Sequence, residues 1–177
     1  MPIIEEMKNI IVLFAPSNSL HIFEKFEDGF NAYQKSLIWA KNVIEKCFIA
    51  EGIENLENGK KETASQKNKV FIFSDSQIEA KCREFSIENP LLQSADLEFV
   101  SKSDWNVYEL LKCMHELCVK EKCENIIYAW ADCPFLNLEV TKEIIQTHQK
   151  YLAEYTFADG YPYGFAPEML ACGTAGI

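Results

Sequence analysis

Residues 126–131 read IIYAWA, an unbroken apolar run that leads directly into Asp132 and continues as CPFLN to Asn137. A strand reads as a continuous apolar run when both faces of its sheet are covered, which is the usual state of a parallel sheet. Residues 10–14, IIVLF, form a second run of this kind. We therefore expect both runs to be inner strands of one sheet, with a carboxylate at the end of the second.

Shorter strand-like runs follow at residues 70–73 and 97–100, and helical patterns separate the runs. Apolar residues recur at steps of three and four from Tyr33 to Phe48, which predicts a helix over residues 31–50. The expected helix caps are Ser74, Asp75 or Ser76 for the second helix, Ser103 or Asp104 for the third, and Asn137 for the fourth. This alternation predicts an α/β fold, a three-layer Rossmann-like sandwich with a mostly parallel central sheet.

Residues 156–177 differ from the rest of the chain, because they hold four of its seven glycines and no apolar run of strand or helix length. We expect two parts: an α/β domain over residues 1–155 and a Gly/Pro-rich tail without a helix or strand. The tail is expected to be the start of a longer chain.

The charge of the chain excludes several classes of partner. Seventeen basic and 27 acidic residues give a net charge of −10, which disfavours nucleic acid and anionic membrane surfaces. Arg83 is the single arginine, although arginine is the usual residue for gripping phosphate. No apolar run approaches the roughly 20 residues of a membrane-spanning helix. A cytoplasmic location is the default expectation.

Candidate site residues follow the predicted strands, because ligands of open parallel sheets bind beyond the carboxyl ends of the strands. Ser17 and Asn18 follow the first strand, Asp75 the second, and Asp132 the fourth. A carboxylate at the end of a buried strand is well placed to hold a divalent cation that bridges phosphate oxygens. An aspartate that accepts hydrogen bonds from loop amides before Pro134 is the alternative, and the residues leave both open.

Residues 126–145, IIYAWADCPFLNLEVTKEII, together with residues 34–38 and 103–116, resemble the framework of the nucleotidyltransferase (GT-A) fold. Molybdenum-cofactor guanylyltransferases and sugar-phosphate cytidylyltransferases share this framework, and the resemblance covers roughly residues 8–155. In these families an Asp-x-Pro-hydrophobic element ends a strand, and its aspartate binds magnesium and the nucleotide phosphates. Asp132 matches that aspartate, with Pro134 and Phe135 in register.

This resemblance implies a set of site residues and ligands. Asp132 would be a ligand of Mg²⁺, and Asp159 is the candidate for a second carboxylate, since apart from Glu168 no later acidic residue lies in a suitable loop. The residues that would contact a nucleotide or nucleotide-sugar are Ser17, Asn18, Lys25 and Asp75.

The loop after the first strand departs from the resembled families. Their active members carry a glycine-rich loop there, with an arginine and a lysine, whose backbone amides cradle a triphosphate. Residues 15–28 read APSNSLHIFEKFED, without glycine or arginine, and Lys25 is the only cation. We expect Ile22, Phe23 and Phe26 to pack on the body of the domain, which keeps this backbone away from phosphate.

Residues 154–170, EYTFADGYPYGFAPEML, resemble the N-terminal region of a spirochaete-restricted family of radical-SAM proteins with a SPASM domain, the spiro-SPASM proteins. The resemblance implies that this chain is the N-terminal domain of a larger protein whose iron–sulfur chemistry lies downstream. The three-cysteine motif CxxxCxxC of radical-SAM enzymes is absent from the 177 residues.

Three functions are compatible with these observations. The leading hypothesis is an accessory or substrate-recognition domain that has lost its triphosphate loop and works with downstream domains of the same chain. An active Mg-dependent nucleotidyl- or glycosyl-transferase, using a nucleotide or nucleotide-sugar, is the first alternative. An unrelated Rossmann-like binding domain is the second.

Overall fold

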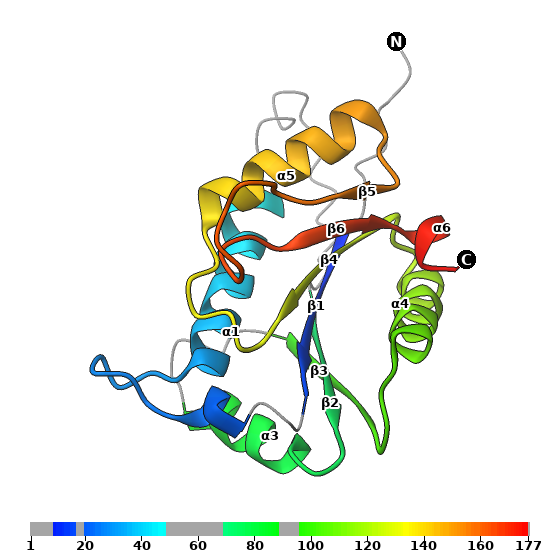
Figure 1. Cartoon of the computed structure of the whole chain (residues 1–177). Coiled ribbons are helices and arrows are strands. Elements are labelled where there is room, and N and C mark those ends of the chain that lie inside the picture. Colours follow the sequence, from blue (N-terminus) through cyan, green and yellow to red (C-terminus); the bar gives the residue numbers. More distant parts are fainter. Residues whose placement is uncertain (1–8, 17–19, 49–68, 89–95, 177) are drawn as a thin grey trace, which may run out of the picture.

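The computed structural model describes residues 9–16, 20–48, 69–88 and 96–176 of the chain. Within this part, six strands form one sheet in the order β3-β2-β1-β4-β6-β5 (Figure 1). The strands are β1 (Asn9–Ala15), β2 (Lys69–Asp75), β3 (Asp96–Lys102), β4 (Asn125–Trp130), β5 (Tyr155–Thr156) and β6 (Glu168–Ala171). The helices are η1 (Leu20–Phe23), α1 (Ala32–Val43), η2 (Ile44–Phe48), α3 (Glu79–Glu88), α4 (Val107–Glu121), α5 (Leu138–Tyr151) and α6 (Cys172–Ala175). The expected α/β class is confirmed.

Strands β1 and β4 are inner strands, as their apolar runs predict. β1 pairs in parallel with β2 on one side and with β4 on the other, so that Val12 lies between Phe71 and Tyr128. Every residue of β1 from Ile10 to Ala15 is buried. Because all three strands run in the same direction, their carboxyl ends meet at one edge of the sheet.

The expectation that residues 156–177 form a tail without a helix or strand is wrong. This segment contributes β6 to the sheet. β6 is antiparallel to both β4 and β5 and lies between them. Met169 of β6 is fully buried. The strand escapes a search for apolar runs because only Met169 and Leu170 of its four residues, EMLA, are buried. This part of the chain therefore belongs to the same sheet as β1, β2, β3 and β4.

Two helices begin at the residues that the sequence indicates. The Asn31 side chain accepts a hydrogen bond from the Gln34 amide at 2.8 Å, and the Gln34 side chain accepts one from the Asn31 amide, which completes a capping box. Asn137 accepts hydrogen bonds from the amides of Glu139 and Val140 at the start of α5. At the N-termini of α1 and α5, backbone amides thus donate hydrogen bonds to the capping side chains.

The predicted cap of α4 is wrong, and α3 begins three or more residues after those that were predicted to cap it. Asn106, and neither Ser103 nor Asp104, caps α4, since its side chain accepts a hydrogen bond from the Glu109 amide. Asp75 is the last residue of β2, and its backbone carbonyl accepts from Ile78 before α3 begins at Glu79. A turn that follows the strand therefore separates Asp75 from the helix.

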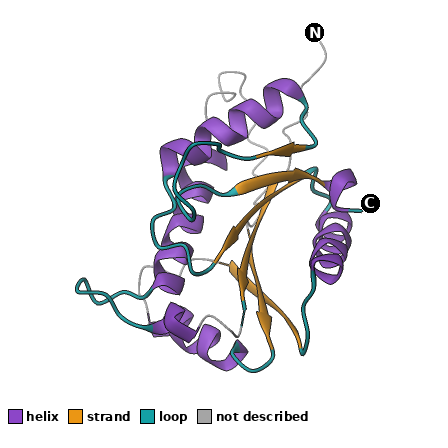
Figure 2. Ribbon diagram, in the orientation of Figure 1, coloured by secondary structure: helices purple, strands orange, loops and turns teal. Residues whose placement is uncertain are grey.

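The two faces of the sheet are covered unequally. Helices α1, α3 and α5 lie on one face, and α4 with the short α6 lies on the other (Figure 2). Side chains of β1 alternate between the faces, with Ile11 and Leu13 in the first cluster and Val12 and Phe14 in the second. One long helix cannot span six strands, so the second face is left partly open beside α4.

No helix in the described ranges is long and apolar enough to cross a membrane.

We predict that β6 is required for the stability of the domain. Substituting Met169 with alanine should lower the free energy of unfolding by about 2–5 kcal/mol, because it opens a cavity between the sheet and α5. The matched control is Leu152→Ala, whose side chain is 81% exposed and whose loss should change stability little. Urea denaturation measures both, and equal effects of the two substitutions would contradict the position of β6.

Candidate functional site

The segment after β1 is packed into the domain through apolar side chains. Ile22 of η1 is only 2% exposed and belongs to the core beneath α1 and α3. The ring of Phe23 stacks on Phe85 of α3 at a centroid distance of 5.2 Å and meets Tyr33 of α1 edge-on at 5.8 Å. These contacts hold the η1 backbone against the helices, as the composition of residues 15–28 predicts.

The remainder of this segment forms an exposed turn. Phe26 is 42% exposed, which corrects the expectation that it packs on the body. Its ring instead lies under the amino group of Lys35, 4.7 Å from the ring centroid. Lys35 also forms an ion pair with Asp28 at 2.7 Å, and this contact lowers the pKa of Asp28. Lys25 is exposed, and Ser17 and Asn18 lie outside the described residues.

Asp132 lies directly after β4, in a turn that α1 holds in place. The amide of Ala131 donates to the carbonyl of Phe14 at 2.9 Å, which keeps the turn beside the end of β1. The buried hydroxyl of Ser36 lies 3.3 Å from the Ala131 carbonyl oxygen and 3.2 Å from that of Cys133. Ser36 thus fixes the backbone on both sides of Asp132, which places the carboxylate at the carboxyl edge of the sheet.

The carboxylate of Asp132 is half-buried and forms no ion pair with a lysine or arginine of the described ranges. Among the described residues, the Cys133 thiol donates a hydrogen bond to it at 3.5 Å, and no loop amide of these ranges donates to it. Burial, and after it the charge of Asp132, raises the pKa of the Cys133 thiol to about 12. The structure therefore does not show the amide-bound loop aspartate that was one interpretation of this residue.

The other two acidic candidates lie in different settings. Asp159 is exposed in the connection between β5 and β6, where it accepts a hydrogen bond from the Gly160 amide at 2.9 Å. Asp75 lies at the end of β2, two strands away from β4. Among the described residues, no group of three or more His, Cys, Asp or Glu side chains is arranged to hold a metal ion. Binding of Mg²⁺ by Asp132 and Asp159 stays a prediction.

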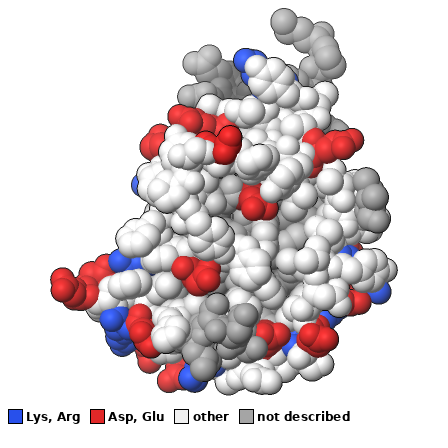
Figure 3. All heavy atoms as spheres, viewed as in Figure 1, with Lys and Arg blue, Asp and Glu red and all other residues white. Residues whose placement is uncertain are grey.

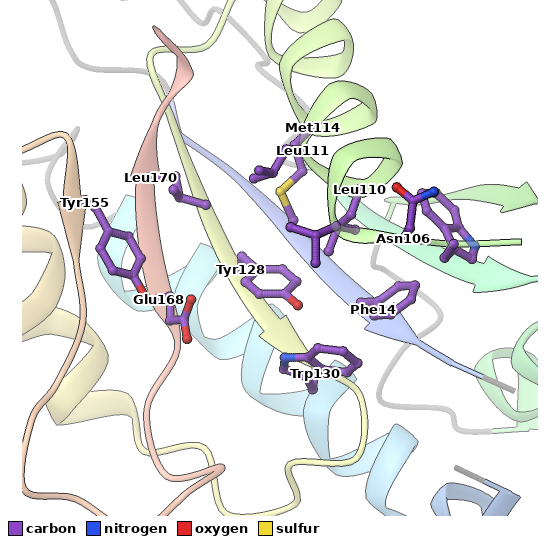
Figure 4. Close-up of a pocket in the computed structure, with 12 residues that line it drawn as sticks. Phe14, Asn106, Leu110, Leu111, Met114, Tyr128, Trp130, Tyr155, Glu168 and Leu170 are labelled. Atoms are coloured by element: carbon purple, nitrogen blue, oxygen red, sulfur yellow. The ribbon is translucent and has the colours of Figure 1, made fainter. Parts of the chain in front are cut away.

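A pocket of about 490 Å³ opens beside α4, on the incompletely covered face of the sheet. Figure 4 shows its walls: side chains of α4 on one side, rings from β1 and β4 at its base, and residues of β5 and β6 opposite. Leu110, Leu111 and Met114 point into it from α4. The aromatic residues that line it are Phe14, Trp105, Tyr128, Trp130 and Tyr155.

Glu168 is the only acidic residue that lines this pocket. Its carboxylate lies beside the hydroxyl of Tyr155 (Figure 4), and burial together with that contact raises the pKa of Tyr155 to about 12. Burial and then the charge of Glu168 also raise the pKa of Tyr128, which pairs with Glu168 across the two strands. In the face shown in Figure 3, Lys and Arg side chains lie toward the periphery, and the centre carries uncharged atoms with a few carboxylates.

The sequence does not reveal this pocket, because its rings come from segments far apart in the chain. Phe14 and Trp130 are neighbours through the pairing of β1 and β4, with ring centroids 4.9 Å apart. Both had been read only as parts of apolar strands. The sequence indicates Glu168, with Asp159, as a later acidic residue in a suitable loop, but it does not place Glu168 beside these rings.

Comparison with solved structures establishes the fold. The chain is similar to a cytidylyltransferase from Leptospira borgpetersenii, with a TM-score of 0.65, 15% identity, and coverage of 96% of this chain and 63% of that one. A CMP:2-keto-3-deoxy-manno-octonic acid synthetase complexed with CTP has a TM-score of 0.60 and 9% identity, with coverage of 96% and 76%. A 4-diphosphocytidyl-2C-methyl-D-erythritol synthase from Anaerococcus prevotii has a TM-score of 0.56 and 9% identity, with coverage of 93% and 71%. The fold is therefore nucleotidyltransferase-like.

Sequence comparison does not assign the chain to a family. No protein-family model matches the chain. An uncharacterized protein of Treponema pallidum is 28% identical over 112 residues, which make up 60% of this chain and 50% of that protein. The chain thus spans half the length of this relative and less than two thirds of the Leptospira structure.

We predict that Asp132 is not needed for stability. Asp132→Asn should change the free energy of unfolding by less than about 0.5 kcal/mol, because the carboxylate has no ion pair to lose and a weak thiol donor as its partner. The control in the same loop is Asn137→Ala, which removes two amide hydrogen bonds at the start of α5 and should cost about 1 kcal/mol. A loss of 2 kcal/mol or more in Asp132→Asn, measured by urea denaturation, would show a structural role.

Proposed function

We propose that this chain is an accessory, substrate-recognition domain with a nucleotidyltransferase-like fold that does not hold a triphosphate after β1. The observation that supports this most directly is the burial of Ile22 and the stacking of Phe23 on Phe85. A phosphate cradle needs several backbone amides that face one anion. In the η1 segment, the side chains of Ile22 and Phe23 instead pack into and against the core.

The pocket beside α4 is the proposed site of ligand recognition. Its volume of about 490 Å³ falls within the range of roughly 300–1,000 Å³ that is typical of small-molecule sites. Such sites combine an apolar lining with a few polar groups, and this one places Glu168 and the hydroxyls of Tyr128 and Tyr155 among aromatic rings. Ligand recognition here requires no catalytic group.

The proposal extends to the whole protein through the resemblance of residues 154–170 to the spiro-SPASM family. A longer chain is compatible with the Treponema relative, of which this chain spans half. In such a protein this domain would present a substrate to downstream radical-SAM and SPASM domains, and the reaction would take place there.

An active Mg-dependent transferase is the second candidate, because Asp132 occupies the strand end with a carboxylate that no described cation neutralises. Mg²⁺ is commonly held by one or two carboxylates, several waters and substrate phosphates. The single carboxylate of Asp132 fits that requirement. It would hold the ion, which would neutralise phosphate charge when bound, and Lys25 is the lysine of residues 15–28, the segment that follows β1.

A thermal-shift titration with Mg²⁺ and the four nucleoside triphosphates separates these two functions. We expect no saturable shift, whereas a ligand at about 100 times its dissociation constant would stabilise the fold by roughly 2.7 kcal/mol. The variants are Lys25→Ala and Asp132→Asn, with Lys150→Ala as the control, since Lys150 is an exposed lysine of α5. A magnesium-dependent shift that disappears in Lys25→Ala and Asp132→Asn, and persists in Lys150→Ala, would overturn the accessory role and support the transferase.

A further inference from the structure

The pocket beside α4 has an unusual lining for a protein whose structural neighbours bind nucleotides. Five of its twelve residues are aromatic, one is glutamate, and none is lysine, arginine or histidine. Lys102, the lysine beside the pocket ring of Trp105, is paired with Glu109, so an anionic ligand would meet the carboxylate of Glu168 without an unpaired cation among the twelve lining residues. A positively charged ligand would meet one carboxylate and several π-faces.

Three of the lining rings meet one another edge to face. Phe14 meets Trp130 at an interplanar angle of 68°, and Tyr128 meets Trp130 at 62°, so the rings form walls at steep angles to one another. An organic cation within about 6 Å of such faces is attracted by their quadrupoles, and the attraction grows when the site excludes water.

Trp105, the other tryptophan of the pocket, already makes a contact of this kind. The amino group of Lys102 lies 5.3 Å from its ring centroid and also pairs with Glu109. Phe73 stacks on the same tryptophan at 5.3 Å. Trp105 is thus held by its neighbours, among them Phe14, which meets it edge-on at 5.6 Å. Tyr128, Trp130 and Tyr155 are the other lining rings.

Glu168 adds a charge of the complementary sign. Its carboxylate faces the pocket between Tyr155 and Tyr128 (Figure 4). Near a protein surface, a carboxylate and a quaternary or protonated amine attract each other more strongly than in bulk solvent. The net charge of −10 favours the approach of a cation over that of an anion.

We propose that this pocket binds an organic cation, a quaternary or protonated amine carried on an apolar body. The inference rests on the proposed function, because it names the ligand class of the recognition site. The ammonium group lies against Trp130 and Tyr128 and close to Glu168, and the apolar body lies along Leu110, Leu111 and Met114. A pocket of about 490 Å³ is large enough for both parts.

Intrinsic tryptophan fluorescence of the whole 177-residue chain tests this with a matched pair of probes. Choline and 3,3-dimethyl-1-butanol have the same shape, and they differ in whether the central atom is a charged nitrogen or a neutral carbon. Two of the three tryptophans line the pocket, and the third, Trp39, is buried on α1 among the core of the opposite face. We expect a saturable change with choline, at least tenfold weaker binding of the alcohol, and weaker choline binding as salt is raised.

The variant Glu168→Gln keeps the shape of the side chain and should weaken choline binding about tenfold without changing the weak binding of the alcohol. Glu139→Gln, at an exposed carboxylate of α5, is the control and should leave choline binding unchanged. Equal affinity for the two probes, or a choline response that Glu168→Gln leaves intact, would overturn the cationic class.

Failure of this inference can be told apart from failure of the proposed function. If the alcohol binds as well as choline and both perturb Trp130, the pocket recognises ligands but not cations. If neither probe perturbs the fluorescence, the cation inference fails. If magnesium and CTP bind in a manner that depends on Lys25, the accessory role fails, whatever choline does.

Discussion

The burial of β1 on both faces is the constraint from which the rest of the structure follows. Its six consecutive buried residues require cover on each side of the sheet. Helices α1, α3 and α5 supply that cover on one face, and η1 adds Ile22 to the same cluster. On the second face, α4 is the only long helix among the described elements. It covers only part of the sheet, and a pocket remains beside it. The packing of η1 and the pocket beside α4 thus both depend on how this one strand is covered.

The sequence predicts those parts of the fold that follow from local residue patterns, such as apolar runs and capping residues. Runs buried on both faces identified β1 and β4, and the side chain of Asn137 marked the start of α5. β6 could not be found in this way, because a four-residue strand with two buried side chains has no pattern of its own and depends on pairing with β4. The cap of α4 was missed because Asn106 competes with Ser103 and Asp104 nearby, and only the helix geometry selects among them.

The features of the candidate site also differ in whether a local sequence pattern predicts them. Asp132 was found because a carboxylate at the end of an apolar run is a local signal, and the packing of Ile22 and Phe23 was expected because apolar side chains replace glycines in that loop. The aromatic pocket depends on strand order, on the single helix that covers that face, and on the return of β6 beside β4. None of these is visible before the fold is known. A familiar fold can therefore keep its strand-end aspartate while the pocket beside α4 is lined mainly by aromatic and aliphatic side chains.

The central claim is that the η1 segment is a packing element and not a phosphate cradle. Two-dimensional NMR of the isotope-labelled chain tests it directly, by following the amide resonances of Ile22, Phe23 and Gly29 while magnesium and CTP are added. The account predicts that these resonances do not move at ligand concentrations up to several millimolar, because their segment is committed to the core through Ile22 and Phe23. Saturable shifts of the Ile22 and Phe23 amides that require magnesium would contradict it.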